Sequence, residues 1–475
     1  MRRAVLVLGV LCVLVGIAVA DPGSSVAGNG GAGNGGVGNR SLSATAVTAM
    51  GAESSAWFCT GGTGSGGVAQ GALLFSNPTP QAVTGTLTTL ATGSAPTSTF
   101  VAAPAASQSG LVPAQGLVGG AVASTVVLNE GGVGVSQVSS GALGLSAGPC
   151  ASTTANHWYF ADASTAQGDT LSLSLFNPTD TFAVVDVSFV SSHGVLAPPA
   201  YQGIEVPGDS MAVENVGIHV PNNPGIATVV STLSGAVVAS ELESAGQAGN
   251  GGASIVLGAT TPTSTWSFAQ NTDAPTGQTV FHVFNPNRRP VRVTVKIGLE
   301  QGAAEPLVMR IPPSSVASLD AQSVTRIPSG STFAVTFISG PGAGIVVDRH
   351  VSSPAGAVAP QQGDTMGVPG GSDRWLLPAA YAPAMSVSTL AVVNLHRTPV
   401  TVRLLRPSAG RLETVAGFGR RRVRPGVPLI VTAGTGSSIG AVPLELESSG
   451  PVAVEIDALP AGSPGVTVIP ALPLR

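Results

Sequence analysis

Charged side chains are scarce in this chain of 475 residues. Asp, Glu, Lys and Arg together make up 9% of it, Lys296 is its only lysine, and the formal net charge is −4. Nucleic-acid binding depends on clustered Lys and Arg, so this composition argues against a nucleic-acid partner. The polar surface must be solvated mostly by Ser, Thr and Asn, as is common in exported β-proteins.

Cysteine is almost as scarce, with three residues in the whole chain. Cys12 lies in an apolar run after Leu11. A lipoprotein signal has a small residue before its cysteine, so lipidation of Cys12 is not expected. The other two, Cys59 and Cys150, form an even pair, which predicts one disulfide in an oxidising compartment. Cys59 shares a strand face with Trp57, two residues before it, and should point into a core.

The N-terminus has the pattern of an export signal. Met1-Arg2-Arg3 precedes an apolar run over 4–20 that ends in Ala18-Val19-Ala20, which predicts cleavage after Ala20. Retention of 4–20 as a membrane anchor is the alternative, because 17 apolar residues are just enough to span a bilayer. Residues 21–52 are rich in Gly, Asn and Ser and should form a flexible linker.

The stretch from Leu171 to Val190 sets the pattern for the rest of the chain. Apolar and polar residues alternate up to Asn177-Pro178 and again after Ala183, which predicts two half-buried strands. We expect an antiparallel hairpin with a tight turn at the Asn, whose side chain accepts from the backbone two residues on.

This pattern occurs four times. Each turn Asn follows a Trp by 19 or 20 residues, and each repeat continues through a Pro-containing turn to a Gly-apolar run that ends in a polar residue. The anchors are Trp57, Trp158, Trp266 and Trp375, with Asn77, Asn177, Asn285 and Asn394. In the fourth repeat Leu395-His396 replaces Pro-Thr, so that turn should differ. The runs place Glu241, Asp348 and Glu455 at equivalent positions, where we expect them to hold a turn or the neighbouring repeat.

A spacing of about a hundred residues fits an all-β fold, a tandem array of four antiparallel, immunoglobulin-like β-sandwich units. A four-bladed propeller is the rival, but its blades are shorter, so we favour a string or arc of sandwiches. The predicted boundaries are 1–20 signal, 21–52 linker, and repeats 1 to 4 at 53–152, 153–260, 261–370 and 371–475.

Few motifs suggest chemistry. Gly208-Asp209-Ser210 resembles the nucleophile block of one esterase class but falls on the recurring Pro-Gly turn. The six histidines, among them His282 and His350, are scattered and show no metal-ligand spacing, so they are interpreted as surface or satisfied residues. No paired carboxylates stand out, and no catalytic residue, metal or cofactor is expected.

Two features leave alternatives open. The tryptophans could form a sugar-stacking platform, although an apolar residue two positions later favours core anchors. The basic run contains Arg420, Arg421, Arg422 and Arg424. It is either a solvated strand edge or a site for an anionic envelope polymer or phospholipid heads.

The signal, the linker and the four Trp…Asn-Pro-Thr…Pro-Gly repeats resemble an uncharacterised family of exported actinobacterial proteins, domain of unknown function 5719. The resemblance runs from about Trp57 to the end and transfers no site residue. It implies an envelope location and a non-enzymatic role.

We therefore expect a secreted or envelope-associated scaffold or accessory in cell-surface assembly. Its partner would be an unknown envelope protein or a cell-wall polysaccharide. The membrane would be contacted only through an uncleaved N-terminal segment. A carbohydrate-binding or adhesive module is the first alternative and a hydrolase the second.

Overall fold

The computed structural model describes residues 44–64, 69–92, 94–111, 120–141, 144–245, 252–272, 277–352, 362–379, 385–408, 411–432, 439–460 and 467–475. The predicted signal and most of the predicted linker lie outside these ranges. Two units are separated, Met1–Arg40 and Ser41–Arg475, and the description below concerns the second. Within the described ranges no helix has the length and apolarity needed to span a membrane.

The strands of the first two repeats alternate with short turns. Repeat 1 contains β1 (Ser55–Thr63), β2 (Gln70–Asn77), β3 (Val83–Ala91), β4 (Thr97–Ala103), β5 (Ser107–Leu111), β6 (Ala121–Leu128), β7 (Gly134–Gly141) and β8 (Gly144–Pro149). Repeat 2 contains β9 (His157–Phe160), β10 (Thr170–Asn177), β11 (Ala183–Ser191), β12 (Gly194–Leu196), β13 (Ile204–Val206), β14 (Ser210–Asn215), β15 (Ala227–Ser234), β16 (Val238–Ala245) and β17 (Gly252–Leu257), with 3₁₀ helices η1 (Pro199–Tyr201) and η2 (Val216–Ile218).

The last two repeats follow the same order. Repeat 3 contains β18 (Thr265–Thr272), β19 (Gln278–Asn285), β20 (Val291–Leu299), β21 (Gly302–Ala303), β22 (Leu307–Ile311), β23 (Ser315–Asp320), β24 (Thr332–Ser339), β25 (Val346–Ser352), β26 (Gln362–Met366) and β27 (Val368–Pro369), with η3 (Ala321–Ser323). Repeat 4 contains β28 (Ser372–Leu377), β29 (Met385–Asn394), β30 (Val400–Ser408), β31 (Arg411–Thr414), β32 (Arg420–Val423), β33 (Pro428–Thr432), β34 (Leu444–Pro460), β35 (Thr467–Pro470) and β36 (Leu472–Pro473).

The fold is all-β and built from antiparallel sheets that pack as sandwiches, as the sequence predicts. Repeat 2 has sheets β14-β10-β16-β17 and β12-β11-β15-β9, and repeat 3 has β21-β20-β24-β18-β27 and β23-β19-β25-β26. In repeat 4 one long strand joins both layers, because the first half of β34 pairs with β28 and β30 and its second half pairs with β29. Repeat 1 likewise forms a single eight-stranded sheet around one core.

The predicted hairpin at 171–190 is wrong in one respect. Strands β10 and β11 belong to different sheets, so the Asn177 turn carries the chain from one layer of the sandwich to the other. Leu173 on one layer and Val187 on the other are both fully buried in the same core. Alternation reports which face of a strand is buried, but it does not distinguish a hydrogen-bonded neighbour from a strand in the opposite sheet.

The predicted disulfide is confirmed. Cys59 on β1 bonds Cys150 just after β8, with an S–S distance of 2.01 Å and a Cα–Cα distance of 4.6 Å. Both cysteines are buried in the core of repeat 1 beside Trp57, as the strand pattern predicted for Cys59. The bridge ties the first strand of the repeat to its end.

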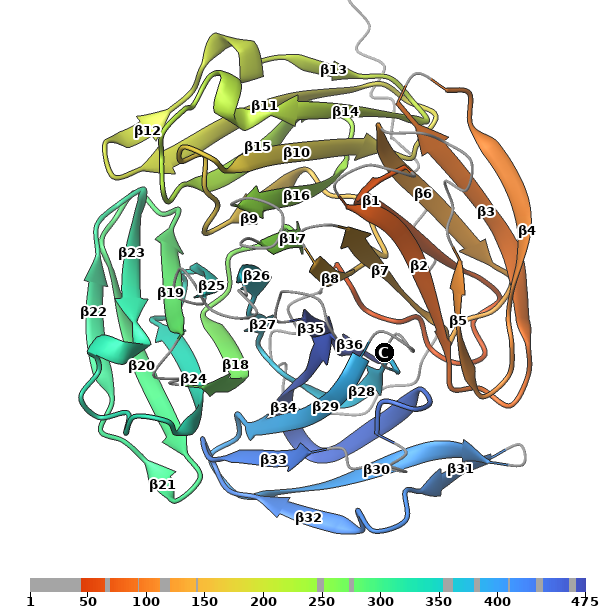
Figure 1. The fold of residues 1–475 in the computed structure, drawn as a ribbon, viewed down its shortest axis with the longest axis vertical. Coiled ribbons are helices and arrows are strands. Elements are labelled where there is room, and N and C mark those ends of the chain that lie inside the picture. The colour runs from red at the N-terminus through yellow and green to blue at the C-terminus, as the bar shows by residue number, and fades with distance from the viewer. Residues whose placement is uncertain are drawn as a thin grey trace, which may run out of the picture. The chain divides into compact units, whose positions relative to one another are not determined.

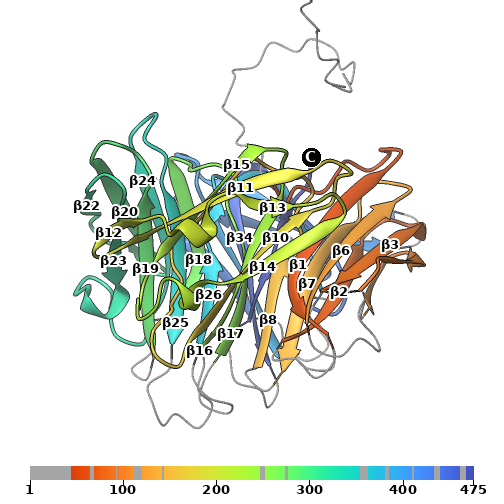
Figure 2. The same cartoon turned by 90° about the horizontal axis from the view of Figure 1, so that it is seen from above.

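The repeats close on themselves rather than forming an open string or arc (Figure 1). The last inner strand of each repeat carries much of this contact: β17 touches both β8 and β26, and β35 touches β8. Figure 2 shows β16, β17 and β8 side by side. The two ends of the closed unit also meet, because Val47 forms a parallel bridge with Leu474.

Candidate functional site

A cluster of buried carboxylates and histidines lies where repeat 2 meets repeat 3. It consists of Asp162, Glu243, His282, Asp348, His350 and Asp364, here called the carboxylate–histidine cluster. Asp162 follows β9, Glu243 lies on β16, His282 on β19, Asp348 and His350 on β25, and Asp364 on β26. Strand pairing aligns His282 with Asp348 and His350 with Asp364, which brings the repeat 3 members to one patch.

The cluster is tightly spaced. His350 Nδ1 lies 2.6 Å from Asp364 Oδ1, and His282 Nε2 lies 3.3 Å from Asp162 Oδ2. One donor atom from each of Asp162, His350 and Asp364 lies within 4.8 Å of the others. Asp162 and Asp364 are 8% and 9% exposed, yet Asp162 Oδ1 and Asp364 Oδ2 have no hydrogen-bond partner among the described residues.

Burial and the crowding of like charges raise the pKa values of several carboxyl groups in this cluster. Burial, followed by the charges of Asp364 and Asp348, raises the pKa of Asp162 well above its usual value. Burial also raises the pKa of Asp348 to about 7, against the hydrogen bond from the Ala161 amide. Negative charge at this interface is therefore only partly compensated by the surrounding protein.

The pKa values of the two histidines are shifted in opposite directions. Burial acts to lower the pKa of His350, but the charge of Asp364 and the hydrogen bond to it outweigh burial and raise this pKa to about 9. Burial lowers the pKa of His282 to about 4, helped by the charge of His350. His282 is thus a neutral imidazole at pH 7, with Nε2 facing Asp162 and Nδ1 3.2 Å from the Ser318 hydroxyl.

A second group of buried polar residues joins one repeat to the next. Asp348 accepts from the amides of Ala161 at 2.7 Å and Asp162 at 3.3 Å. In the next pair of repeats Glu455 accepts from Ala269 at 2.9 Å and Gln270 at 3.2 Å. This confirms the prediction that Asp348 and Glu455 hold the neighbouring repeat.

The equivalence proposed for Glu241 is wrong by one residue. His282 and Ser174 both precede their turn Asn by three, and His282 pairs with Asp348 whereas Ser174 pairs with Ser240. Ser240 therefore holds the Asp348 position, and its hydroxyl lies 2.5 Å from that of Thr60 in repeat 1. Glu241 faces the opposite side of its strand, because a shift of one residue reverses the face.

Repeats 3 and 4 share a buried ion pair. Arg349 on β25 and Glu455 on β34 are 2.5 Å apart, with side chains 3% and 5% exposed. Arg349 also donates to Asn271 Oδ1 at 3.0 Å and lies 5.4 Å from the ring centre of Phe268.

Repeats 4 and 1 are joined by an amide side chain. Gln108 donates from Nε2 to the Ala379 carbonyl at 2.9 Å, and its Oε1 accepts from the Ala379 amide at 2.7 Å. These two bonds link residues 271 positions apart. The closed arrangement thus has a polar contact at each of its four junctions.

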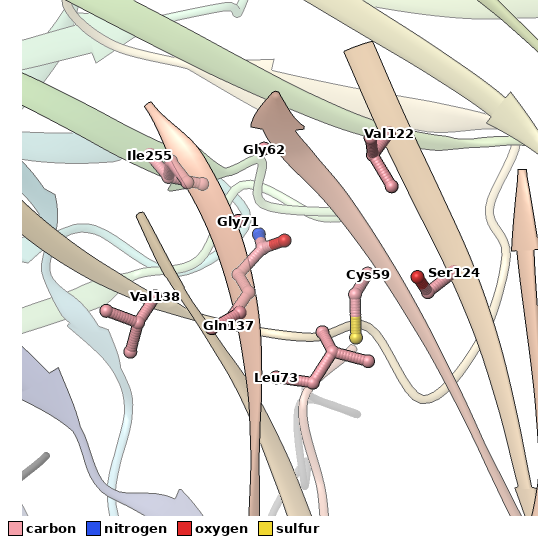
Figure 3. A pocket seen from close by; sticks show the side chains of 10 residues that line it. Cys59, Gly62, Gly71, Leu73, Val122, Ser124, Gln137, Val138 and Ile255 are labelled. Atoms are coloured by element: carbon pink, nitrogen blue, oxygen red, sulfur yellow. The ribbon is translucent and has the colours of Figure 1, made fainter. Parts of the chain in front are cut away.

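A small pocket lies beside the disulfide in repeat 1 (Figure 3). It is lined by Cys59, Leu73, Gln137 and, from repeat 2, Ile255. Its cavity volume is about 20 Å³, room for a single water molecule. Gln137 Nε2 has no hydrogen-bond partner within the described part of the chain, so a bridging water suits this pocket better than a ligand.

The four tryptophans are 0–3% exposed and lie in the cores of their repeats. Trp158 Nε1 donates to Val237 at 2.9 Å and Trp266 Nε1 to Ile345 at 2.6 Å. Their rings are therefore unavailable for stacking on a sugar in this state.

Each turn Asn makes the same set of bonds. Asn177 donates to the carbonyls of Thr181 and Val206 and accepts from the Thr179 amide at 3.1 Å. Asn77, Asn285 and Asn394 repeat this arrangement. The turn at Asn394 keeps it although Leu395-His396 replaces Pro-Thr, so the expected difference there is absent.

The other sequence candidates lie apart from the cluster. Ser210 donates to the Pro207 carbonyl at 2.7 Å on an exposed turn, where Asp209 has φ of +50°. The arginines of β32 are exposed, and Arg421 donates to the Phe418 carbonyl. Arg424 contacts the Glu300 carbonyl of repeat 3 at 3.4 Å.

The carboxylate–histidine cluster is not predicted by the sequence patterns described above. Its members lie up to 202 positions apart, from 162 to 364, and no local spacing links them. One signal was available, since comparison of the repeats shows His282 and Asp364 at positions where the other repeats carry small or apolar residues.

These observations define an all-β repeat protein, disulfide-bonded and closed by polar contacts between repeats. Residues 114–339 match the model of the family described as "Family of unknown function (DUF5719)", the family expected from the repeats. The match covers three members of the cluster and ends before Asp348.

The remaining comparisons add no argument about function. No curated protein matches the chain. The structure titled "Crystal Structure of Thermotoga maritima 1070" is 13% identical, with 22% of this chain and 94% of that chain covered and a TM-score of 0.20. A tetra-tandem repeat in the extending region of a large adhesion protein is 13% identical, with 85% and 95% covered and a TM-score of 0.11.

Proposed function

We propose that this chain is a non-catalytic scaffold or accessory of the cell surface, which acts as a closed array of β-sandwich repeats outside the cytoplasm. The observation that carries the proposal is the use of buried polar side chains. Asp348, Glu455 and Gln108 each bond the backbone of a neighbouring repeat. Buried polar groups that bond a neighbouring repeat in this way are suited to fixing a shape.

The disulfide supports an extracytoplasmic location, because such bonds persist mainly in oxidising compartments. The apolar segment 4–20 supports export, with cleavage after Ala20 or retention as an anchor. Burial of the tryptophans favours a scaffold over the carbohydrate-binding alternative. The position of Ser210 on an exposed turn weighs against the hydrolase.

Complementation of a deletion strain tests the scaffold. Glu455→Gln should lower both the stability of the protein and its ability to restore envelope integrity, because it breaks the buried ion pair with Arg349 between repeats 3 and 4. Ser210→Ala and Asp209→Asn, both on the exposed turn, should restore integrity fully. Loss of function in Ser210→Ala at wild-type stability would replace the scaffold with the hydrolase.

A second candidate role is contact with an anionic envelope polymer through β32. Arg420 and Arg422 are exposed and, two residues apart on a strand, face the same side. Arg420 pairs in register with Arg403 of β30, whose charge is met by Glu447, so the row depends on Arg420 and Arg422. Binding of purified protein to teichoic-acid-type polyphosphate should weaken with salt and with Arg420→Gln/Arg422→Gln, but not with the control Arg288→Gln. Equal loss in the control would assign the binding to general charge.

A further inference from the structure

The junction between repeats 2 and 3 differs in chemistry from the other three junctions. Each junction brings together four structurally equivalent positions. Two of them are the residue four after the Trp of one repeat and the residue three before the turn Asn of the next repeat. The other two are a residue on the strand that carries the polar contact and the residue that pairs with it on the inner strand. Junction 2/3 has Asp162, His282, His350 and Asp364 at these positions. Junction 1/2 has Gly61, Ser174, Leu242 and Ile255.

Junction 4/1 resembles junction 1/2, whereas junction 3/4 carries one ionisable side chain. Junction 4/1 has Ala379, Leu74, Val138 and Ala147, and junction 3/4 has Gln270, Ala391, Asp457 and Val468. Leu242 packs on Ile255, and Leu74 packs on Val138. Apolar contact fills this place at junctions 1/2 and 4/1, and junction 3/4 has the single acid Asp457 there, so four ionisable side chains at junction 2/3 call for a separate explanation.

Packing with the protein alone leaves that junction unsatisfied. Asp162 Oδ1 and Asp364 Oδ2 belong to side chains more than nine-tenths buried and have no partner among the described residues. Glu243, 6% exposed, adds a third carboxylate whose Oε2 accepts from the Ser164 amide at 2.9 Å. Buried carboxylate oxygens without a donor are costly, and a bound cation removes that cost.

We propose that Asp162, His282, His350 and Asp364 bind one Zn²⁺ ion that joins repeat 2 to repeat 3. Two imidazoles and two carboxylates form a donor set that zinc accepts, whereas Ca²⁺ and Mg²⁺ prefer oxygen ligands alone. Bond lengths of about 2.0–2.1 Å place tetrahedral donors about 3.3 Å apart. The His282–Asp162 distance is 3.3 Å, and the donors of Asp162, His350 and Asp364 lie within 4.8 Å of one another. His350 Nδ1 and Asp364 Oδ1 are 2.6 Å apart, so these two side chains would have to move apart to take up the ion.

The surroundings favour a structural ion. Four protein donors leave no open position for substrate, as in closed zinc sites. The Ser318 hydroxyl lies 3.2 Å from His282 Nδ1 and orients that ring with Nε2 toward Asp162. Because Asp162 comes from repeat 2 and the other three donors from repeat 3, the ion would act as a cross-link. This inference does not depend on the proposed scaffold role.

The test uses the full chain, stripped of metal with a chelator and titrated with ZnCl₂ by calorimetry. One equivalent should bind, and Zn²⁺ should raise the midpoint of thermal unfolding. Asp364→Asn keeps the side-chain size and should weaken binding at least about 100-fold, because loss of outer-shell partners alone already costs about 10–100-fold. His282→Gln should do the same, while the exposed control Asp180→Asn should bind like wild type.

Replacement of Zn²⁺ by Co²⁺ provides a direct signature. A tetrahedral site with imidazole ligands should give visible Co²⁺ absorption in the wild type and in Asp180→Asn, and none in His282→Gln. Absence of stoichiometric zinc binding to the stripped wild-type chain would overturn the proposal. So would wild-type affinity in Asp364→Asn, or binding of Ca²⁺ in preference to Zn²⁺.

Discussion

The substitution Glu455→Gln should destabilise the junction between repeats 3 and 4. It keeps an acceptor for the amides of Ala269 and Gln270 but removes the charge that faces Arg349 at 2.5 Å. Both side chains of this pair are at least 95% buried, so the guanidinium would be left without its counter-charge. Breaking a buried pair in this way costs about 3–5 kcal/mol.

The double variant Arg349→Met/Glu455→Gln removes both charges and should recover most of this loss, because an apolar side chain can fill the space of a buried ion pair. Amide hydrogen exchange at Ala269 and Gln270 is the suitable assay, since it reports on one junction of a large repeat protein. A loss of about 3 kcal/mol corresponds to roughly 100-fold faster exchange. Less than tenfold acceleration in Glu455→Gln, or a double variant as labile as the sum of the single ones, would refute this reasoning.

Three further predictions concern the core, the turns and a buried acid. Replacing both Cys59 and Cys150 by Ala should cost about 4–5 kcal/mol, because the bridge closes a loop of 91 residues; an unchanged urea midpoint would contradict it. Asn177→Ala should cost about 2–3 kcal/mol in the same assay, since it leaves the carbonyls of Thr181 and Val206 without their donor, whereas the exposed control Asn129→Ala should cost less than about 1 kcal/mol. Burial and the charge of Glu455 raise the pKa of Asp457 well above its usual value, so the folded state holds this proton more tightly than the unfolded state and stability falls as pH rises above the unfolded pKa of about 3.9. Asp457→Asn should therefore stabilise the protein at pH 7 and lose this advantage below about pH 4; equal gains at both pH values would exclude Asp457 as the cause.

Local pattern was sufficient to predict the strands and their buried faces. The alternation around Asn177 identified which residues enter the core, and the spacing of Trp57 and Cys59 placed both on one buried face. The turn bonds of Asn177 were predictable because an Asx turn involves residues only two apart. Such features depend on neighbours in sequence, which the sequence shows directly.

Features set by contacts between distant residues were less accessible. The sequence of a Gly-apolar run does not determine which of its residues pairs with a given residue of the next strand. Glu241 was therefore aligned with Asp348, whereas strand pairing shows that Ser240 is the equivalent residue. Whether the repeats form an arc or close depends on the angle between neighbours, to which long-range bonds such as Gln108 to Ala379 contribute. The carboxylate–histidine cluster likewise exists only once the repeats are in contact.

The central claim is that polar side chains join the repeats into a closed unit, and hydrogen exchange at a single amide tests it most directly. The Ala379 amide donates to Gln108 Oε1 at 2.7 Å, across the junction between the last repeat and the first. We predict that this amide is protected in the wild type and exchanges much faster in Gln108→Ala, while the Ala269 amide at another junction is unchanged. Exchange of Ala379 at the rate of an open chain in the wild type would contradict the closed arrangement.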